Sequence, residues 1–134
     1  MINISDKLLF NSGSYRVSSK ANKILEKLAQ VINSEPSMEV MVEGHTDSRT
    51  INTPMVTDNW DLSVKRSAQV VKILQKDYGV NPDKLIAAGR GEYNKLADNA
   101  SSEGKSMNRR TRIILMPKLG QFYDLLKPQT VSIN

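Results

Sequence analysis

Several kinds of residue are absent or rare in this sequence, and each absence narrows the range of functions. The 134 residues include no cysteine, one histidine and one tryptophan, and aromatic residues make up 5%. The lack of cysteine excludes a disulfide scaffold, a thiolate metal site and a cysteine nucleophile. There is also no run of about 18 apolar residues, which a membrane-spanning helix needs. The first residues lack the basic-then-apolar pattern of a secretory signal, so a protein acting outside the cytoplasm would contain this chain as a mature piece or as one domain.

The remaining composition is typical of one soluble globular domain over residues 1–134. Hydrophobic residues make up 39% and charged residues 25%, and a chain of this length buries a single sizeable core. The formal net charge is +5, and the basic excess lies in residues 48–134. A basic surface attracts nucleic acid, anionic lipid or a carboxylate-rich polymer, which keeps a basic nucleic-acid-binding domain open as an alternative function. Because no aromatic residues are interleaved with the basic ones, a single-stranded nucleic-acid platform is disfavoured, and a solvated surface is the simpler interpretation of the charge alone.

The spacing of apolar residues predicts alternating strands and helices. Alternation by twos indicates strands, and recurrence every three or four residues indicates amphipathic helices. We expect strands at 2–4, 38–45, 85–88 (buried) and 109–116, helices at about 21–32 and 62–77, polar loops at 47–61 and 92–108, and a short amphipathic segment at 119–126. This order predicts an α/β fold, an α+β sandwich in which the helices pack on one face of a mixed sheet.

The densest group of polar residues lies at the end of the second predicted strand. Glu43, His45 and Asp47 follow one another at every second position, so in an extended chain they leave the same face. Nitrogen and oxygen ligands at this spacing suit a divalent metal, which keeps a metal-dependent enzyme open as an alternative. Against it, His45 is the only histidine and no second ligand cluster is evident. No nucleophile-elbow motif or phosphate-cradling loop supports catalysis either.

A recognition site is the remaining interpretation of the charged residues. Asp47 follows a predicted strand, Arg66 lies on the next helix, and Arg109 begins the last strand, so all three would meet at one end of the sheet. Such a site suits a zwitterion, whose ammonium would face the aspartate and whose carboxylate would face an arginine. Neither Asp47 nor Arg66 lies on an apolar stripe, so we expect the fold to survive the loss of either side chain.

Several short motifs occur in an order shared with a known family. They are Leu8-Leu9-Phe10-Asn11-Ser12-Gly13, Glu43-Gly44-His45-Thr46-Asp47, Asn59-Trp60-Asp61-Leu62-Ser63 with Arg66 shortly after, Gly89-Arg90-Gly91-Glu92 and Asn108-Arg109-Arg110. Through these motifs, over about residues 2–116, the chain resembles the C-terminal peptidoglycan-binding domains of the OmpA/MotB family. The resemblance implies a βαβαβ-type OmpA-like fold and leaves residues 117–134 as a C-terminal extension. The long loop between Asp47 and Asn59 resembles the MotB branch more than the outer-membrane proteins.

The resemblance also implies a function. A domain of this family is non-catalytic, uses no metal or cofactor, and binds peptidoglycan noncovalently through the diaminopimelate residue of the stem peptide. It would thereby anchor an outer-membrane protein, a lipoprotein or a MotB-like stator to the cell wall, in the periplasm of a Gram-negative-type bacterium. The partner would be peptidoglycan and not nucleic acid, and contact with a membrane would come only through parts of the parent protein absent from this chain. A homodimer is left open.

The family's binding residues carry over onto six positions of this sequence. Asp47 and Arg66 are implied to hold the diaminopimelate residue. The other positions are Asn59 and Arg109, as supporting contacts, and Thr46 and Leu62, as lining of the pocket.

Overall fold

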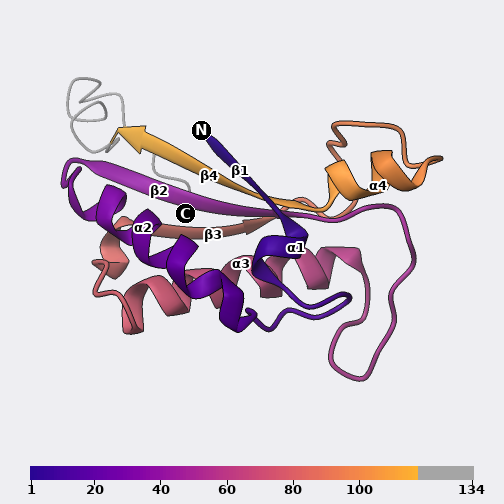
Figure 1. Ribbon diagram of the computed structural model, residues 1–134, viewed down its shortest axis with the longest axis horizontal. Coiled ribbons are helices and arrows are strands. Elements are labelled where there is room, and N and C mark those ends of the chain that lie inside the picture. The colour runs from indigo at the N-terminus through magenta and orange to yellow at the C-terminus, as the bar shows by residue number, and fades with distance from the viewer. Residues whose placement is uncertain (118–134) are drawn as a thin grey trace, which may run out of the picture.

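A four-stranded sheet with two long helices on one face forms the centre of the computed structural model, which describes residues 1–117 (Figure 1). The elements in chain order are β1 (Ile2–Ser5), α1 (Asp6–Leu9), a 3-10 turn (Ser19–Ala21), α2 (Asn22–Asn33), β2 (Met38–His45), α3 (Asn59–Lys76), a second 3-10 turn (Pro82–Lys84), β3 (Leu85–Gly89), α4 (Ser102–Asn108) and β4 (Arg110–Pro117). The predicted α/β class with a mixed sheet is confirmed. Apart from Pro117, the expected C-terminal extension, including the segment 119–126, lies outside the described residues.

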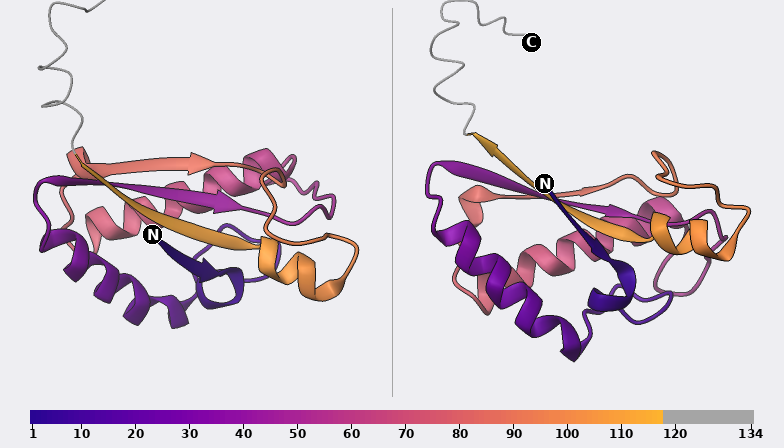
Figure 2. Two further views of the ribbon diagram at one scale, coloured as in Figure 1. Left: turned by 90° about the horizontal axis from the view of Figure 1, so that it is seen from above. Right: turned by 45° about the horizontal axis from the view of Figure 1, so that its top comes forward.

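The sheet order is β1-β4-β2-β3. Strands β2 and β3 are parallel and are joined through α3, whereas β4 runs antiparallel to both β1 and β2. Helices α2 and α3 both lie against the same side of this sheet, as Figure 2 shows from two further directions. The end of β2, the beginning of α3 and the beginning of β4 therefore meet at one end of the molecule.

The hydrophobic core lies between the sheet and these two helices. Val40 and Val42, two residues apart on β2, are fully buried on the helix-covered face, as their alternation predicts. The helices meet them with side chains at helical spacing, which are Leu25, Leu28 and Ile32 from α2 and Val70 and Leu74 from α3. None of the helices within residues 1–117 has the length and apolar character that crossing a bilayer requires.

Helix α3 begins at Asn59, three residues before the start that the apolar spacing predicts. The Asp58 side chain caps the helix by accepting a hydrogen bond from the Asp61 amide (2.8 Å), so the first turn forms ahead of the apolar stripe. The earlier start brings Asn59 into the first turn of the helix, beside the loop that follows β2.

The polar segment 92–108 contains a helix that the sequence pattern does not indicate. Helix α4 is capped by the Ser101 hydroxyl, which accepts from the Gly104 amide (2.9 Å). The buried Asn108 side chain accepts from the amides of Leu96 and Ala97 and donates to the Ala97 carbonyl. These polar contacts, rather than an apolar stripe, hold α4 against its preceding loop.

The sequence predicts a buried strand at residues 85–88, and the predicted burial is wrong. Strand β3 forms at this position, but it is an edge strand, and each of its residues is at least partly exposed.

At the end of β3, helix α3 packs very closely on the sheet. A Cβ atom at Gly44 would lie 2.3 Å from the Ser63 carbonyl oxygen, and one at Gly89 would lie 2.5 Å from the Ser63 hydroxyl oxygen. Glycine at both positions therefore lets the first turns of α3 approach the sheet.

Candidate functional site

A charged hollow of about 220 Å³ lies where β2 ends and α3 begins. The loop after α1 closes one side of it, with Ser12 and Gly13 in its lining. All six site residues expected from the sequence line this hollow, namely Thr46, Asp47, Asn59, Leu62, Arg66 and Arg109. The structure thus gathers residues that lie up to 63 positions apart into one site, from α3, from the loop after β2 and from the junction between α4 and β4.

Asp47 is buried just beyond the end of β2, and two arginines hold its carboxylate. One oxygen accepts from the Arg49 amide (2.9 Å), and the other accepts from Arg49 Nε (3.0 Å) and from Arg109 Nη1. Burial alone would raise the pKa of Asp47, but the hydrogen bonds from Arg109 and Arg49 outweigh it, and the pKa lies below its ordinary value. Asp47 is therefore a carboxylate at neutral pH. Since a carboxylate accepts about four hydrogen bonds, roughly one position is left for a ligand.

Asn59 fixes the loop that carries these groups. Its side-chain amide donates to the Asp47 carbonyl (3.2 Å) and to the Arg49 carbonyl (2.9 Å). Because Asn59 belongs to the first turn of α3, these bonds tie the loop to the beginning of the helix. The first turn of a helix also carries partial positive charge, which favours an anionic group in the hollow.

Arg66 is buried on the inner side of α3, and its main partner is Asp6. Arg66 Nη1 donates to the Asp6 carboxylate, and Arg66 Nε donates to the Ser14 carbonyl (2.7 Å). The guanidinium also lies over the Phe10 ring, with 4.7 Å between the guanidinium carbon and the ring centroid. Burial lowers the pKa of Arg66, although Asp6 opposes this effect. An arginine remains protonated at physiological pH even so.

Asp6 is a site residue that the sequence analysis missed. Burial raises the pKa of Asp6 above its ordinary value, despite the opposing charges of Arg66 and Arg109. Its Oδ2 also lies 3.9 Å from Arg109 Nε, so Arg109 stands between two aspartates. The antiparallel register places Ser5 opposite Arg110, and hence Asp6 beside Arg109, but this pairing cannot be read from the local pattern. Arg49 was missed as well, because a lone arginine in a polar loop carries no signal.

The charges around the hollow alternate in sign and leave a positive excess. Asp6 and Asp47 face Arg49, Arg66 and Arg109. Asp47 and Arg66, the two residues expected to hold a ligand, do not bond each other, and each already has partners from other parts of the chain. The arrangement can accept one more anionic group on the arginines and one more donor on Asp47.

The three residues of the metal alternative do not converge. His45 Nε2 lies 2.6 Å from a Glu43 oxygen on the sheet face that faces away from α2 and α3, whereas the Asp47 carboxylate turns to Arg49 and Arg109. The Glu43 carboxylate is further held by Arg90 and Arg112, each at 3.4 Å. Across residues 1–117, no three histidine, cysteine or acidic side chains gather as a metal site would require.

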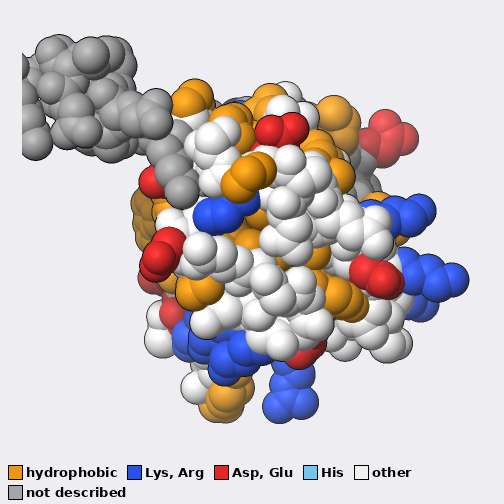
Figure 3. All heavy atoms as spheres, turned by 90° about the vertical axis from the view of Figure 1, so that its left-hand side faces the viewer, with side chains coloured by type: hydrophobic (Ala, Val, Ile, Leu, Met, Phe, Trp, Pro, Cys, Tyr) orange, Lys and Arg blue, Asp and Glu red, His pale blue; other side chains and the backbone are white. Residues whose placement is uncertain are grey.

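The basic residues are also poorly placed for a nucleic acid. Five arginines of the second half, which are Arg49, Arg66, Arg90, Arg109 and Arg112, form ion pairs with buried carboxylates. At the end of the molecule away from the hollow, basic and acidic side chains are interspersed (Figure 3). On this face of residues 1–117, such a distribution does not favour a phosphate backbone, which binds along a continuous basic track.

The Glu43–His45 pair leads to a prediction about stability and pH. Burial lowers the pKa of His45, and the charges of Arg110 and Arg112 lower it further. Glu43 acts in the opposite direction but does not outweigh them. The folded protein therefore binds the proton less readily than the unfolded chain, and unfolding becomes easier as pH falls below about 6.5. In chemical denaturation between about pH 7.5 and 5.5, we expect His45→Gln to flatten this slope, which for one proton is at most about 1.4 kcal/mol per pH unit. Glu43 does not titrate in this pH range. Burial alone would raise the pKa of Glu43, but the hydrogen bonds from His45 and Arg90 keep it below its ordinary value. An unchanged slope in the variant would contradict this assignment.

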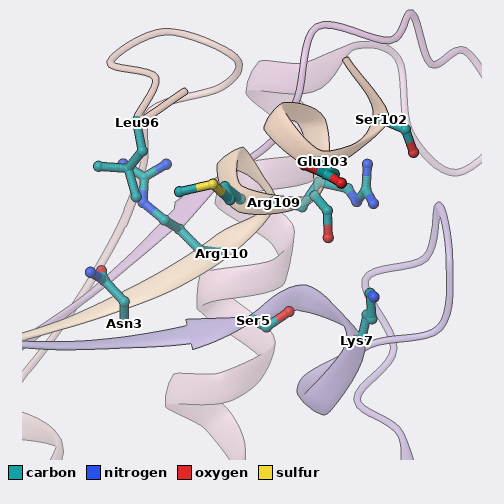
Figure 4. A pocket seen from close by; sticks show the side chains of 10 residues that line it. Asn3, Ser5, Lys7, Leu96, Ser102, Glu103, Arg109 and Arg110 are labelled. Atoms are coloured by element: carbon teal, nitrogen blue, oxygen red, sulfur yellow. The ribbon is translucent and has the colours of Figure 1, made fainter. Parts of the chain in front are cut away.

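A second hollow, of about 530 Å³, lies on the other side of Arg109. Figure 4 shows Asn3 and Ser5 of β1 on one side of it, α4 with Glu103 on the opposite side, and Arg109 and Arg110 between them. Leu96 and Met107 on its rim are both more than half exposed. Arg109 lines both hollows, so the two are neighbours across one side chain.

The fold is thus a mixed sheet with helices on one face and, at its end, a charged hollow lined by ion-paired side chains. The chain belongs to the OmpA family, whose model matches residues 9–109, and its members are structural domains and not enzymes. The chain is 28% identical to motility protein B of Bacillus subtilis over 118 residues, which cover 88% of the chain and 45% of that protein. The chain thus spans less than half the length of this relative.

Two solved structures show the same similarity in three dimensions. The periplasmic domain of Helicobacter pylori MotB superimposes with a TM-score of 0.80 at 25% identity. The match covers 97% of this chain and 85% of the MotB chain. The cell wall anchor of the type VI secretion system from Pseudomonas aeruginosa superimposes with a TM-score of 0.80 at 32% identity. This match covers 87% of this chain and 80% of the anchor chain. The expected family, with its MotB-like branch, is confirmed.

Proposed function

We propose that this chain binds peptidoglycan noncovalently through the diaminopimelate residue of the stem peptide, and so anchors a cell-envelope protein to the cell wall. The observation that carries the proposal is the hollow in which Asp47, Arg66 and Arg109 come together. The side-chain terminus of diaminopimelate bears one ammonium and one carboxylate on the same carbon. Asp47 has room for the ammonium, and the positive excess on the arginines suits the carboxylate.

The relatives support an extracytoplasmic site of action. One solved neighbour is a periplasmic domain, and another is a cell wall anchor. The similarity to motility protein B favours a stator-like parent, and the long loop between Asp47 and Asn59 points the same way. An outer-membrane protein or a lipoprotein is the other type of parent that the expected function allows, and sequencing the full gene product would distinguish them.

The test of the function is ligand selectivity. We expect calorimetry to show tighter binding of an uncrosslinked muropeptide with diaminopimelate than of the same muropeptide with lysine. The lysine peptide keeps the ammonium and lacks the carboxylate, so it loses a charge-assisted hydrogen bond worth about 1.5–3 kcal/mol, which is roughly 10- to 150-fold in affinity. Equal affinity for the two peptides would contradict the proposed pairing.

A further inference from the structure

Two exposed aromatic side chains stand beside the charged hollow, outside the set of residues that line it. Trp60 is 50% exposed and Tyr93 is 55% exposed. Their ring centroids are 5.2 Å apart with an interplanar angle of 33°, so the two rings pack against each other in a tilted arrangement. Trp60 is the single tryptophan of the sequence. A large exposed aromatic pair next to a binding site is a feature that packing alone does not explain.

The Trp60 ring packs against the backbone of Gly91. A Cβ atom at Gly91 would come within 3.3 Å of Trp60 Cδ2, and Gly91 has a φ of +61°. The Gly91 amide donates to the Ser63 hydroxyl (2.9 Å), and the Gly91 carbonyl accepts from the Thr46 amide (2.8 Å). Because Thr46 lines the charged hollow, the segment that supports the ring is tied to that hollow.

A polar hollow of about 210 Å³ connects the two features. It shares Thr50, Ile51 and Asn59 with the charged hollow, and its further lining includes Ser48, Asn52 and Glu92. Asn59 and Glu92 line this hollow and directly precede Trp60 and Tyr93 in the chain, so the aromatic pair follows directly on from two of its lining residues. Its lining offers hydroxyl, amide and carboxylate groups and no basic side chain.

This combination fits a carbohydrate. A pyranose ring presents a face of C–H groups, which the negative face of an aromatic ring attracts, and a rim of hydroxyls that hydrogen-bond to amides, hydroxyls and carboxylates. Phosphate-bearing ligands fit poorly, since the connecting hollow has acidic and no basic groups. We propose that Trp60, Tyr93 and the connecting hollow bind sugar rings of the glycan strand. This inference rests on the proposed function, because stem peptide and glycan are covalently joined and a site for the former brings the latter within reach.

The first experiment uses Trp60 as its own probe. The protein is titrated with a peptide-free tetrasaccharide of alternating N-acetylglucosamine and N-acetylmuramic acid while tryptophan emission is recorded. The lactyl carboxyl groups of the tetrasaccharide are capped as simple amides, so that the probe carries no charge that could bind the arginines of the charged hollow. We expect a saturable change in emission and protection of Trp60 from iodide quenching, with no such change for maltotetraose at equal concentration. A flat titration with undiminished quenching would overturn the inference.

The second experiment separates sugar from peptide. Calorimetry compares a disaccharide-linked stem peptide with the free stem peptide on the parent protein, Trp60→Ala and Tyr93→Ala. We expect each variant to bind the disaccharide-linked ligand about 10-fold more weakly and to bind the free peptide as the parent does. Equal losses for both ligands, or no loss, would overturn the inference.

Met107→Ala is the matched control, because Met107 is 57% exposed and lies on the second hollow. We expect it to bind both ligands like the parent, and a loss confined to the disaccharide-linked ligand would place the sugar in the second hollow and overturn the inference. The outcomes also separate the two proposals. If the tetrasaccharide binds and the free peptide does not, the stem-peptide function fails and the glycan subsite stands. If the free peptide binds and the tetrasaccharide does not, the reverse holds.

Discussion

Asp47→Asn is expected to weaken binding of a diaminopimelate stem peptide by roughly 10- to 150-fold, while the protein stays folded. The substitution keeps the volume of the side chain and removes the one negative charge that can face the ligand ammonium. The arginines around it tolerate the change, since Arg49 is largely exposed and Arg109 retains Asp6. Calorimetry with the purified peptide measures the loss, and sedimentation with isolated sacculi measures it on the intact wall.

The control for Asp47→Asn is a change on the exposed surface. Lys95 is exposed and belongs to neither the charged hollow nor an ion pair within residues 1–117. Lys95→Ala should sediment with sacculi like the parent and keep the same circular dichroism. Retention of full binding by Asp47→Asn would show that this carboxylate does not hold the ligand.

Arg66→Ala is expected to lower the free energy of unfolding by about 3–5 kcal/mol, because it leaves the buried Asp6 carboxylate without its main partner. The sequence-based expectation that the fold survives the loss of Arg66 needs correction, since its side chain is buried and pairs with the N-terminal segment. Loss of peptidoglycan binding by this variant would therefore not by itself identify a ligand contact.

The sign of the pH dependence distinguishes the ion pair from simple packing. Burial raises the pKa of Asp6, so the folded state holds a proton more readily than the unfolded chain, and removing Arg66 strengthens this preference. The destabilisation by Arg66→Ala should therefore be smaller in an acidic buffer than at pH 7, because protonation of Asp6 removes its unpaired charge. In the double variant with Asp6→Asn, part of the stability should return at pH 7. An equal loss at both pH values, with no recovery in the double variant, would point to lost packing instead.

The sequence predicts the sheet and the two long helices well, because each has one apolar face. Val40 and Val42 alternate on β2, and α2 repeats its apolar residues at helical spacing. Local spacing fails where polar contacts decide the structure. The first turn of α3 depends on the Asp58 cap, and α4 depends on the hydrogen bonds of Asn108.

The six expected site residues came mainly from motif order rather than from periodicity, and the hollow does contain them all. The partners that set their electrostatics were not predictable in the same way. Asp6 lies 60 residues from Arg66 in the chain, and no local pattern links the two. Their pairing follows only from the antiparallel placement of β1 beside β4, which is a property of the folded sheet.

The same long-range pairing has a consequence for the order in which this domain is assembled. The Asp6 amide donates to the Arg109 carbonyl (3.0 Å), so the first and the last parts of the described chain meet at the hollow. Closing so large a loop is slow and costs entropy, and the contacts that repay it form only once β4 is in place. During synthesis, the nascent domain therefore has no complete hollow until Arg109 has left the ribosome. Under the proposed function, the capacity to bind the wall is thus gained at the end of folding, and a bound ligand then stabilises the finished state against reopening.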